Sequence, residues 1–183
     1  KLISTMESNA AQIYQMCFSK DDNYLLSTSY HGVKSWDIKN QKLIATYLDL
    51  DENNYAIVLP DQYYFSTKNA YKYIHYTKGL KVYPFESFDL KYNRPDIVMQ
   101  QLGIKNDALQ NSLKKVYEKR LNKSGFKDSD LSGELNLPNV KIENEGEFIK
   151  ASQALGKATI KIKVSDAKFN LNRLLIRVNG VPL

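Results

Sequence analysis

Few residues of this 183-residue chain could perform chemistry, and the first pair to consider is a thiol and an imidazole. Cys17 is the single cysteine, and His31 stands directly before Gly32. A cysteine nucleophile activated by a histidine can cleave peptide bonds. A reactive thiolate needs an electropositive, partly exposed setting, whereas Cys17 lies between Met16 and Phe18 in an apolar segment. We therefore expect neither Cys17 nor His31 to be catalytic.

The sequence predicts no metal or cofactor site. His31 and His75 are far apart and form no shared motif, and one cysteine excludes a multi-cysteine site. Asp49-Leu50-Asp51-Glu52 has part of the acidic pattern of a calcium loop but lacks its Gly and its final Glu. No glycine-rich phosphate loop or nucleophile elbow occurs. We expect this chain not to be an enzyme.

Tyrosines are the candidate partner-binding residues. Nine of the 13 lie between Tyr47 and Tyr92, where they could form a stacking surface or fill gaps between strands. Packing is the favoured interpretation for most of them. Tyr71, Tyr73 and Tyr76 are the expected exceptions, because alternate residues of one predicted strand share a face.

The formal net charge of +6 is unevenly distributed. Residues 1–90 carry 9 basic and 10 acidic residues, whereas residues 91–183 carry 17 and 10. A basic second half could attract nucleic acid or an acidic partner, although lysines spread over a helix and strands usually form a solvated face.

A repeat of about 40 residues organises the first half of the chain. Residues 1–6 match residues 42–47, residues 24–28 match residues 63–67, and Gly32-Val33-Lys34-Ser35-Trp36-Asp37 ends a strand on a Trp-Asp pair. This pattern resembles a WD-repeat and predicts propeller blades over residues 1–90. A propeller needs at least four blades, so about two should leave an incomplete ring whose unpaired edges favour self-association.

Alternating apolar residues predict the strands of these blades. Lys1–Glu7 is expected to be the outer strand of a preceding blade. The expected strands of the first blade are Gln12–Ser19, Tyr24–Ser29, Val33–Ile38 and Lys42–Leu48. Those of the second blade are Tyr55–Leu59, Tyr63–Thr67, Tyr71–Tyr76 and Lys81–Phe85.

Residues 91–136 are predicted to form a two-helix connector. Pro95 suits the first turn of a helix over Arg94–Leu102, and Asn106 suits the N-cap of a second helix that ends near Gly125. The apolar stripe of the second helix is Leu109, Leu113, Val116, Tyr117 and Leu121.

Residues 137–183 return to alternation and are predicted to start an immunoglobulin-like β-sandwich. The expected strands are residues 138–143, 158–164 and 173–178. The predicted fold class is therefore mainly β, with two blades, a helical connector and a partial sandwich.

Several motifs together resemble a bacterial family in which WD-repeats precede a caspase-like or related cysteine peptidase domain. They are Leu59-Pro60-Asp61-Gln62-Tyr63-Tyr64 with Ser66, Lys72-Tyr73-Ile74, Val82-Tyr83-Pro84, Phe88, Tyr92-Asn93-Arg94-Pro95-Asp96-Ile97, Leu137–Ile142 and Arg177-Val178-Asn179-Gly180. The resemblance implies that any peptidase domain lies beyond Leu183, and that Cys17 and His31 are ordinary repeat residues.

The function expected from these observations is a non-catalytic protein-interaction or spacer segment of a larger WD-repeat protein. The alternative is nucleic-acid or acidic-partner binding through the basic half. No apolar run approaches the length of a membrane span, no signal-peptide pattern is present, and the lone cysteine fits a cytoplasmic setting.

Overall fold

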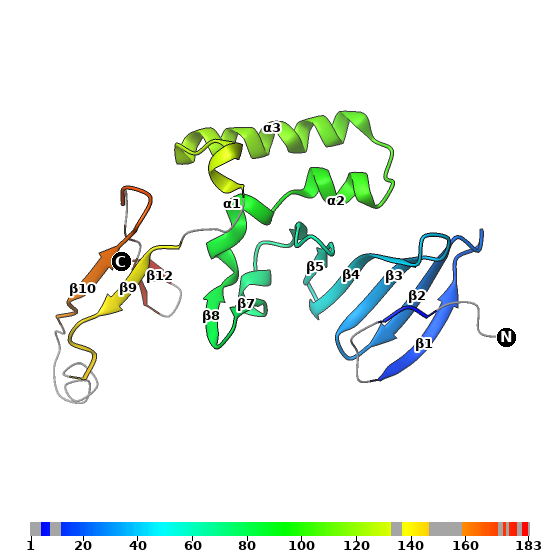
Figure 1. Cartoon of the computed structure of the whole chain (residues 1–183), viewed down its shortest axis with the longest axis horizontal. Coiled ribbons are helices and arrows are strands. Elements are labelled where there is room, and N and C mark those ends of the chain that lie inside the picture. The colour runs from blue at the N-terminus through cyan, green and yellow to red at the C-terminus, as the bar shows by residue number, and fades with distance from the viewer. Residues whose placement is uncertain are drawn as a thin grey trace. The chain divides into compact units, whose positions relative to one another are not determined.

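The computed structural model describes residues 5–7, 12–132, 137–146, 159–171, 174, 176–178 and 181–182. The chain divides into two compact units, residues 1–130 and 131–183. The first unit combines an open antiparallel sheet with three α-helices (Figure 1). In the described part of the chain the sheet does not close into a propeller.

The sheet of the first unit has six strands in the order of the sequence, and each is antiparallel to its neighbours. Asp22 takes the left-handed conformation in the turn after the first strand, as an Asp in a turn readily does. The strands are β1 (Ile13–Phe18), β2 (Tyr24–Ser29), β3 (Gly32–Asp37), β4 (Lys42–Asp51), β5 (Asn54–Val58) and β6 (Tyr64–Ser66). The predicted strands of the first blade are present as β1 to β4.

The segment predicted to begin the second blade continues this sheet instead of starting a sheet of its own. β4 extends to Asp51 and pairs with β5, with Tyr47 opposite Ile57 and Asp51 opposite Asn54. The Asp51 carboxylate accepts hydrogen bonds from the Asn54 amide and thereby closes a tight hairpin. Two separate sheets are therefore not formed by these strands.

The prediction of a strand over Tyr71–Tyr76 is wrong for residues 71–74, and only its last two residues are in a strand. Ala70–Lys72 forms a 3₁₀ turn, η1, because fully buried Ala70 anchors this segment against the sheet. The strands β7 (His75–Lys78) and β8 (Lys81–Pro84) then form a separate hairpin, followed by the 3₁₀ turn η2 (Phe85–Phe88) and the short helix α1 (Asp89–Tyr92).

The connector helices are α2 (Pro95–Gln101) and α3 (Asp107–Ser124), and the 3₁₀ turn η3 (Asp128–Leu131) follows them. Pro95 begins α2, as predicted. The Asn106 side chain accepts a hydrogen bond from the Leu109 amide at 3.0 Å and caps α3, while left-handed Gly125 ends it. These three boundary predictions are confirmed.

The predicted apolar stripe of α3 is only partly buried. Tyr117 and Leu121 are buried, whereas Leu109 and Val116 are exposed. α3 packs on α2, which is less than half as long, and Val116 lies about 100° around the helix from Tyr117. Of these two helices, α2 packs against the sheet, at β6.

Both cores lie over one half of the sheet, strands β4 to β6. On one face, here called the α2 face, Val98 packs with Ala45 and Leu59, and Tyr47, Ile57 and other partly buried side chains surround them. On the opposite face, here called the aromatic face, the buried residues are Tyr64, Ala70 and Phe85, and the partly buried ones around them include Val58 and Tyr76. The half formed by β1 to β3 carries neither core.

The second unit contains short strands. β9 (Asn139–Ile142) pairs antiparallel with β10 (Ile162–Ser165), and β11 (Arg177–Val178) pairs with β12 (Val181–Pro182). Parts of the predicted strands 158–164 and 173–178 lie outside the described residues, as do Lys1–Ser4 of the first predicted strand. The immunoglobulin-like sandwich stays a prediction. Among the described residues, no helix combines the length and apolar character that crossing a membrane requires.

Candidate functional site

The outer edge of the sheet, strand β1, is the most unusual surface of the first unit. Five of its six residues are apolar, a pattern typical of a strand covered on both faces. All six side chains are nevertheless exposed, with Tyr14 at 57%, Met16 at 64% and Phe18 at 66% of full exposure. We call Ile13–Phe18 the β1 edge; Figure 1 shows it at the free end of the sheet.

Strand pairing places the side chains of the β1 edge on both faces of the sheet. Met16 and Phe18 lie opposite Ser27 and Leu25 on the aromatic face, and Cys17 lies opposite Leu26 on the α2 face. Because the elements that cover these faces lie over β4 to β6, neither face of β1 is covered. Strand β1 therefore exposes apolar side chains on both the aromatic face and the α2 face, at the open edge of the sheet.

The hydrogen-bond phase shows which backbone groups of β1 point away from the sheet. The Ser19 amide donates to the Tyr24 carbonyl at 2.9 Å, so this pair is hydrogen-bonded. Hydrogen-bonded pairs alternate along an antiparallel ladder, so Cys17 is also bonded to β2. The N–H and C=O groups of Met16 and Phe18 consequently point outward, and no described strand pairs with them.

The ends of the β1 edge differ in charge. The strand itself carries no Asp, Glu, Lys, Arg or His, whereas Lys20, Asp21 and Asp22 form the turn that follows it. The Asp21 carboxylate accepts a hydrogen bond from the Ser19 hydroxyl at 2.6 Å, and this bond, together with those from Asn23, lowers the pKa of Asp21. Charge is therefore confined to one end of the strand.

Cys17 lies in a hollow of about 530 Å³ on the α2 face, lined by Gln15, Met16, Cys17, Leu26 and Thr28. His31 lies in the turn after β2, whereas Leu26, the partner of Cys17, lies three residues before the end of β2, so about 10 Å of strand separates Cys17 from the start of that turn. The exposed His31 ring instead meets the Tyr30 ring edge-on. The structure therefore does not bring the thiol and the imidazole together.

The three tyrosines predicted to bind a partner do not form one exposed face. Tyr71 is partly buried against the aromatic core, and Tyr76 stacks on Phe85 with ring centroids 5.5 Å apart. Burial raises the pKa of Tyr76 well above its ordinary value. Only Tyr73 is exposed, and its hydroxyl donates to the Asp51 carboxylate.

The polar residues of the Tyr-Asn-Arg-Pro-Asp motif have structural roles. The Arg94 guanidinium donates two hydrogen bonds to Asp96, at 2.7 and 2.9 Å, and lies 3.9 Å from the centre of the Tyr117 ring. Burial would raise the pKa of Asp96, but the hydrogen bonds and charge of Arg94 outweigh burial and lower it. This pair fixes the start of α2 against α3.

A second group of hydrogen bonds joins α1 to the sheet and to α3. The Asp89 carboxylate accepts from the Tyr64 hydroxyl at 2.7 Å, the Asn93 amide at 2.8 Å and Arg120 at 3.2 Å. Burial and this bond to Asp89 strongly raise the pKa of Tyr64. Each of these groups is engaged in holding elements together, so the arrangement offers no acid–base pair for catalysis.

A larger hollow, about 610 Å³, lies beside the β3–β4 turn and is lined in part by Tyr24, Asp37, Lys42, Asp61 and Gln101. The Asp37 carboxylate accepts bonds from the turn that follows it, which lowers its pKa. The described residues contain no group of three or more potential metal ligands.

Comparisons with protein-family models, curated proteins and solved structures find no match to this chain. The candidate site therefore rests on the geometry of the β1 edge. Tyr14, Met16 and Phe18 were not among the binding residues predicted from the sequence. The available signal was that β1 is apolar at both odd and even positions, which a half-buried strand does not require.

Proposed function

We propose that residues 1–130 form a non-catalytic protein-interaction module that binds an extended strand of a partner protein along the β1 edge. The observation that carries this proposal is the exposure of Tyr14, Met16 and Phe18 on an edge strand with outward-pointing backbone groups. Such an edge is a template for pairing with another strand. Strand addition supplies main-chain hydrogen bonds, and alternate side chains supply specificity.

The chemistry of the edge defines the partner strand. It must be uncharged where it meets Gln15–Phe18 and must carry apolar side chains on both faces, because the aromatic and α2 faces of β1 are both open. A partner strand of this kind would remove apolar surface from water on both faces at about 25 cal/mol per Å². A helix would leave the outward N–H and C=O groups unpaired.

The wider setting in this proposal is a WD-repeat protein linked to a caspase-like peptidase outside this chain. Its support is the strand ending in Trp36-Asp37, the four-stranded meander β1 to β4, and the Tyr92–Ile97 motif. In that setting the first half supplies propeller-blade strands, and residues 137–183 begin an immunoglobulin-like spacer.

The test measures binding of labelled strand-forming peptides by fluorescence anisotropy. Peptides with apolar residues on both faces should bind saturably, and copies interrupted by proline should not. The chain should carry Cys17→Ser to exclude disulfide capture. The outcome that contradicts the proposal is equal binding of interrupted and uninterrupted peptides.

Two substitutions locate the binding at the β1 edge. Phe18→Pro removes an outward N–H without removing a hydrogen bond to β2, so it should abolish binding, and Phe18→Ala should only weaken it. Leu80→Lys is the matched control, because Leu80 is fully exposed on the separate β7–β8 hairpin. Unchanged affinity in Phe18→Pro would contradict strand addition.

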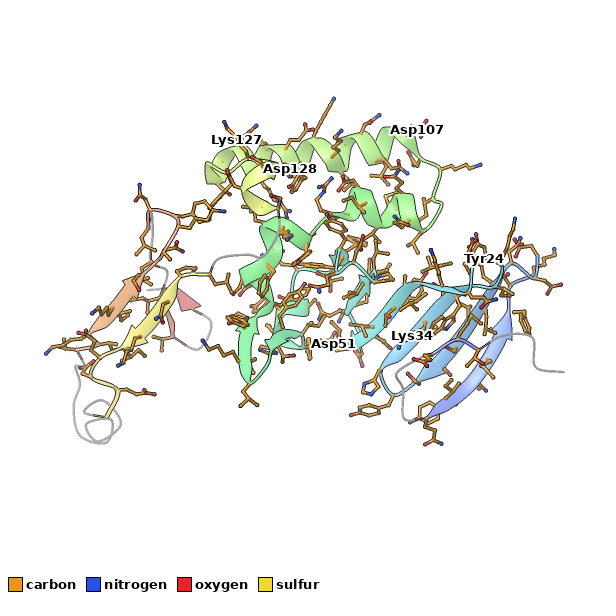
Figure 2. The ribbon with its side chains drawn as sticks, viewed as in Figure 1. Tyr24, Lys34, Asp51, Asp107, Lys127 and Asp128 are labelled. Atoms are coloured by element: carbon orange, nitrogen blue, oxygen red, sulfur yellow. The ribbon has the colours of Figure 1, made fainter. Side chains whose placement is uncertain are left out.

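A second candidate function, nucleic-acid or acidic-partner binding, is favoured by the exposed lysines of α3. Lys114, Lys115, Lys119 and Lys123 are exposed, and neither ion pair found among the described residues includes them. Figure 2 labels Asp107, the first residue of α3, and Lys127, which follows the end of that helix. Contacts to phosphates should give a steep negative slope of log affinity against log salt, and a flat slope would exclude nucleic acid.

A further inference from the structure

We propose that the strand added to the β1 edge is the β1 edge of a second copy of this chain, paired antiparallel about a two-fold axis at Cys17. This inference rests on the proposed function and names the partner of the same site. A two-fold axis makes each copy use the same patch, so the edge must be complementary to itself.

The outward backbone groups restrict the register. Only residues whose N–H and C=O groups point away from β2 can form hydrogen-bonded pairs across the new interface. Within the regular part of β1 these are Met16 and Phe18. A two-fold axis through Phe18 would place Met16 opposite Lys20, which lies in the turn after β1, and would form a single hydrogen-bonded pair. The axis therefore passes either through Met16, which pairs with itself, or through Cys17, which makes each Met16 face Phe18 of the other copy.

The β-bulge in β1 decides between the two registers. An axis through Met16 would place Phe18 opposite Tyr14, but the pairing with β2 shifts between Ile13 and Gln15, so Tyr14 is the extra residue of a bulge. An axis through Cys17 needs only residues on the regular side of the bulge. It forms four hydrogen bonds, two in each Met16–Phe18 pair.

The side chains of this register are complementary. On the aromatic face, each Met16 thioether lies beside the Phe18 ring of the other copy, a favourable sulfur–aromatic contact. The charged turn at Lys20, Asp21 and Asp22 is brought toward the uncharged start of the other β1, so no like charges face each other. The second copy thus meets the requirement for an uncharged strand that is apolar on both faces.

The same register brings two thiols together on the α2 face. Cys17 of one copy faces Cys17 of the other as a non-hydrogen-bonded pair, for which the Cα atoms lie about 4.5 Å apart. A disulfide spans Cα separations of about 4.4–6.8 Å. Since Cys17 is exposed, a thiol oxidant such as diamide should join the copies by oxidising the two thiols to one disulfide while diamide is reduced to its hydrazine.

The experiment treats the whole chain with diamide and reads the product on a non-reducing gel. We expect a reducible species of twice 21.1 kDa to form readily in the wild-type chain. Register controls carry Cys17→Ser with either Met16→Cys or Gln15→Cys. They should cross-link at least tenfold more slowly, because Met16 pairs are offset diagonally by about 7–8 Å and Gln15 pairs lie farther apart. Equal cross-linking at all three positions would overturn the register.

Sedimentation velocity of Cys17→Ser tests association without a disulfide. We expect a dimer at high concentration that dissociates on dilution, and a monomer for Phe18→Pro with unchanged circular dichroism. A Cys17→Ser chain that stays monomeric throughout overturns the inference. If that monomer still binds strand peptides at the β1 edge, the proposed function stands alone, whereas loss of both activities removes both proposals.

Discussion

Replacing Trp36 tests whether packing of its ring stabilises strand β3 within the sheet. The Trp36 ring is 5% exposed, and its indole N–H donates to the Ser27 hydroxyl at 2.9 Å. Ser27 itself is buried on the adjoining strand β2. Trp36→Ala removes the apolar volume and this bond, so we expect the free energy of unfolding to fall by about 3–5 kcal/mol.

The hydrogen bond is isolated by a double-mutant cycle with Trp36→Phe and Ser27→Ala. Each single change leaves one buried partner unsatisfied and should cost about 1–3 kcal/mol. The double variant removes both partners, so its loss should be smaller than the sum of the single losses by about 1 kcal/mol. Additive losses would show that the bond does not contribute.

The assay for this cycle is urea unfolding followed by far-ultraviolet circular dichroism, because Trp36 is the sole tryptophan and its fluorescence disappears with it. Tyr30→Ala is the matched control. Tyr30 is 86% exposed in the neighbouring turn, so its loss should change stability by less than about 0.5 kcal/mol. An unchanged urea midpoint in Trp36→Ala would refute the packing role of the ring.

Three further predictions concern backbone and ionisation. Gly32→Ala should destabilise the chain more than Gly79→Ala in urea unfolding, because both have positive φ but only at Gly32 would a Cβ meet a backbone oxygen, at 2.3 Å. Tyr73→Phe should raise the pKa of Asp51 from about 2 toward its ordinary value in an NMR titration, because the hydrogen bond from Tyr73 is the main cause of the lowered pKa. In the unchanged chain, the contribution of Asp51 to stability is present above pH 4 and is lost as the pH falls toward 2. Absorbance titration should show Tyr117 ionising near pH 12, because burial and, to a smaller extent, a hydrogen bond to a carboxylate raise its pKa. The contribution of Tyr117 to stability should be lost as the pH rises from about 10 through 12.

Local signals in the sequence predicted the elements of the first unit well. Alternation located β1 to β4, and Asn106 and Gly125 located the ends of α3, because capping depends on neighbouring residues alone. The pairing of β4 with β5 was not predictable in the same way. A turn at Asp51 suits either a hairpin or a link between blades, and only the tertiary partners of the two strands decide which one forms.

The candidate site was harder to predict than the fold. Alternation could not show that β1 is the sheet edge, since exposure of Met16 and Phe18 depends on which strands lie beside them. The prediction that Tyr71, Tyr73 and Tyr76 share one exposed face was wrong. Ala70 is buried and lies in a 3₁₀ turn, so Tyr71 and Tyr76 contact the aromatic core. Both the exposure of β1 and the burial of these tyrosines depend on long-range packing.

Amide hydrogen exchange along β1, measured by NMR on the Cys17→Ser chain, tests strand addition most directly. The Met16 and Phe18 amides point outward, whereas the amide of residue 17 is bonded to β2. At high protein concentration, or with a saturating strand peptide, the account predicts that exchange at Met16 and Phe18 slows at least tenfold while residue 17 is protected throughout. Fast exchange at Met16 and Phe18 under every condition would contradict the proposal that the β1 edge binds a strand.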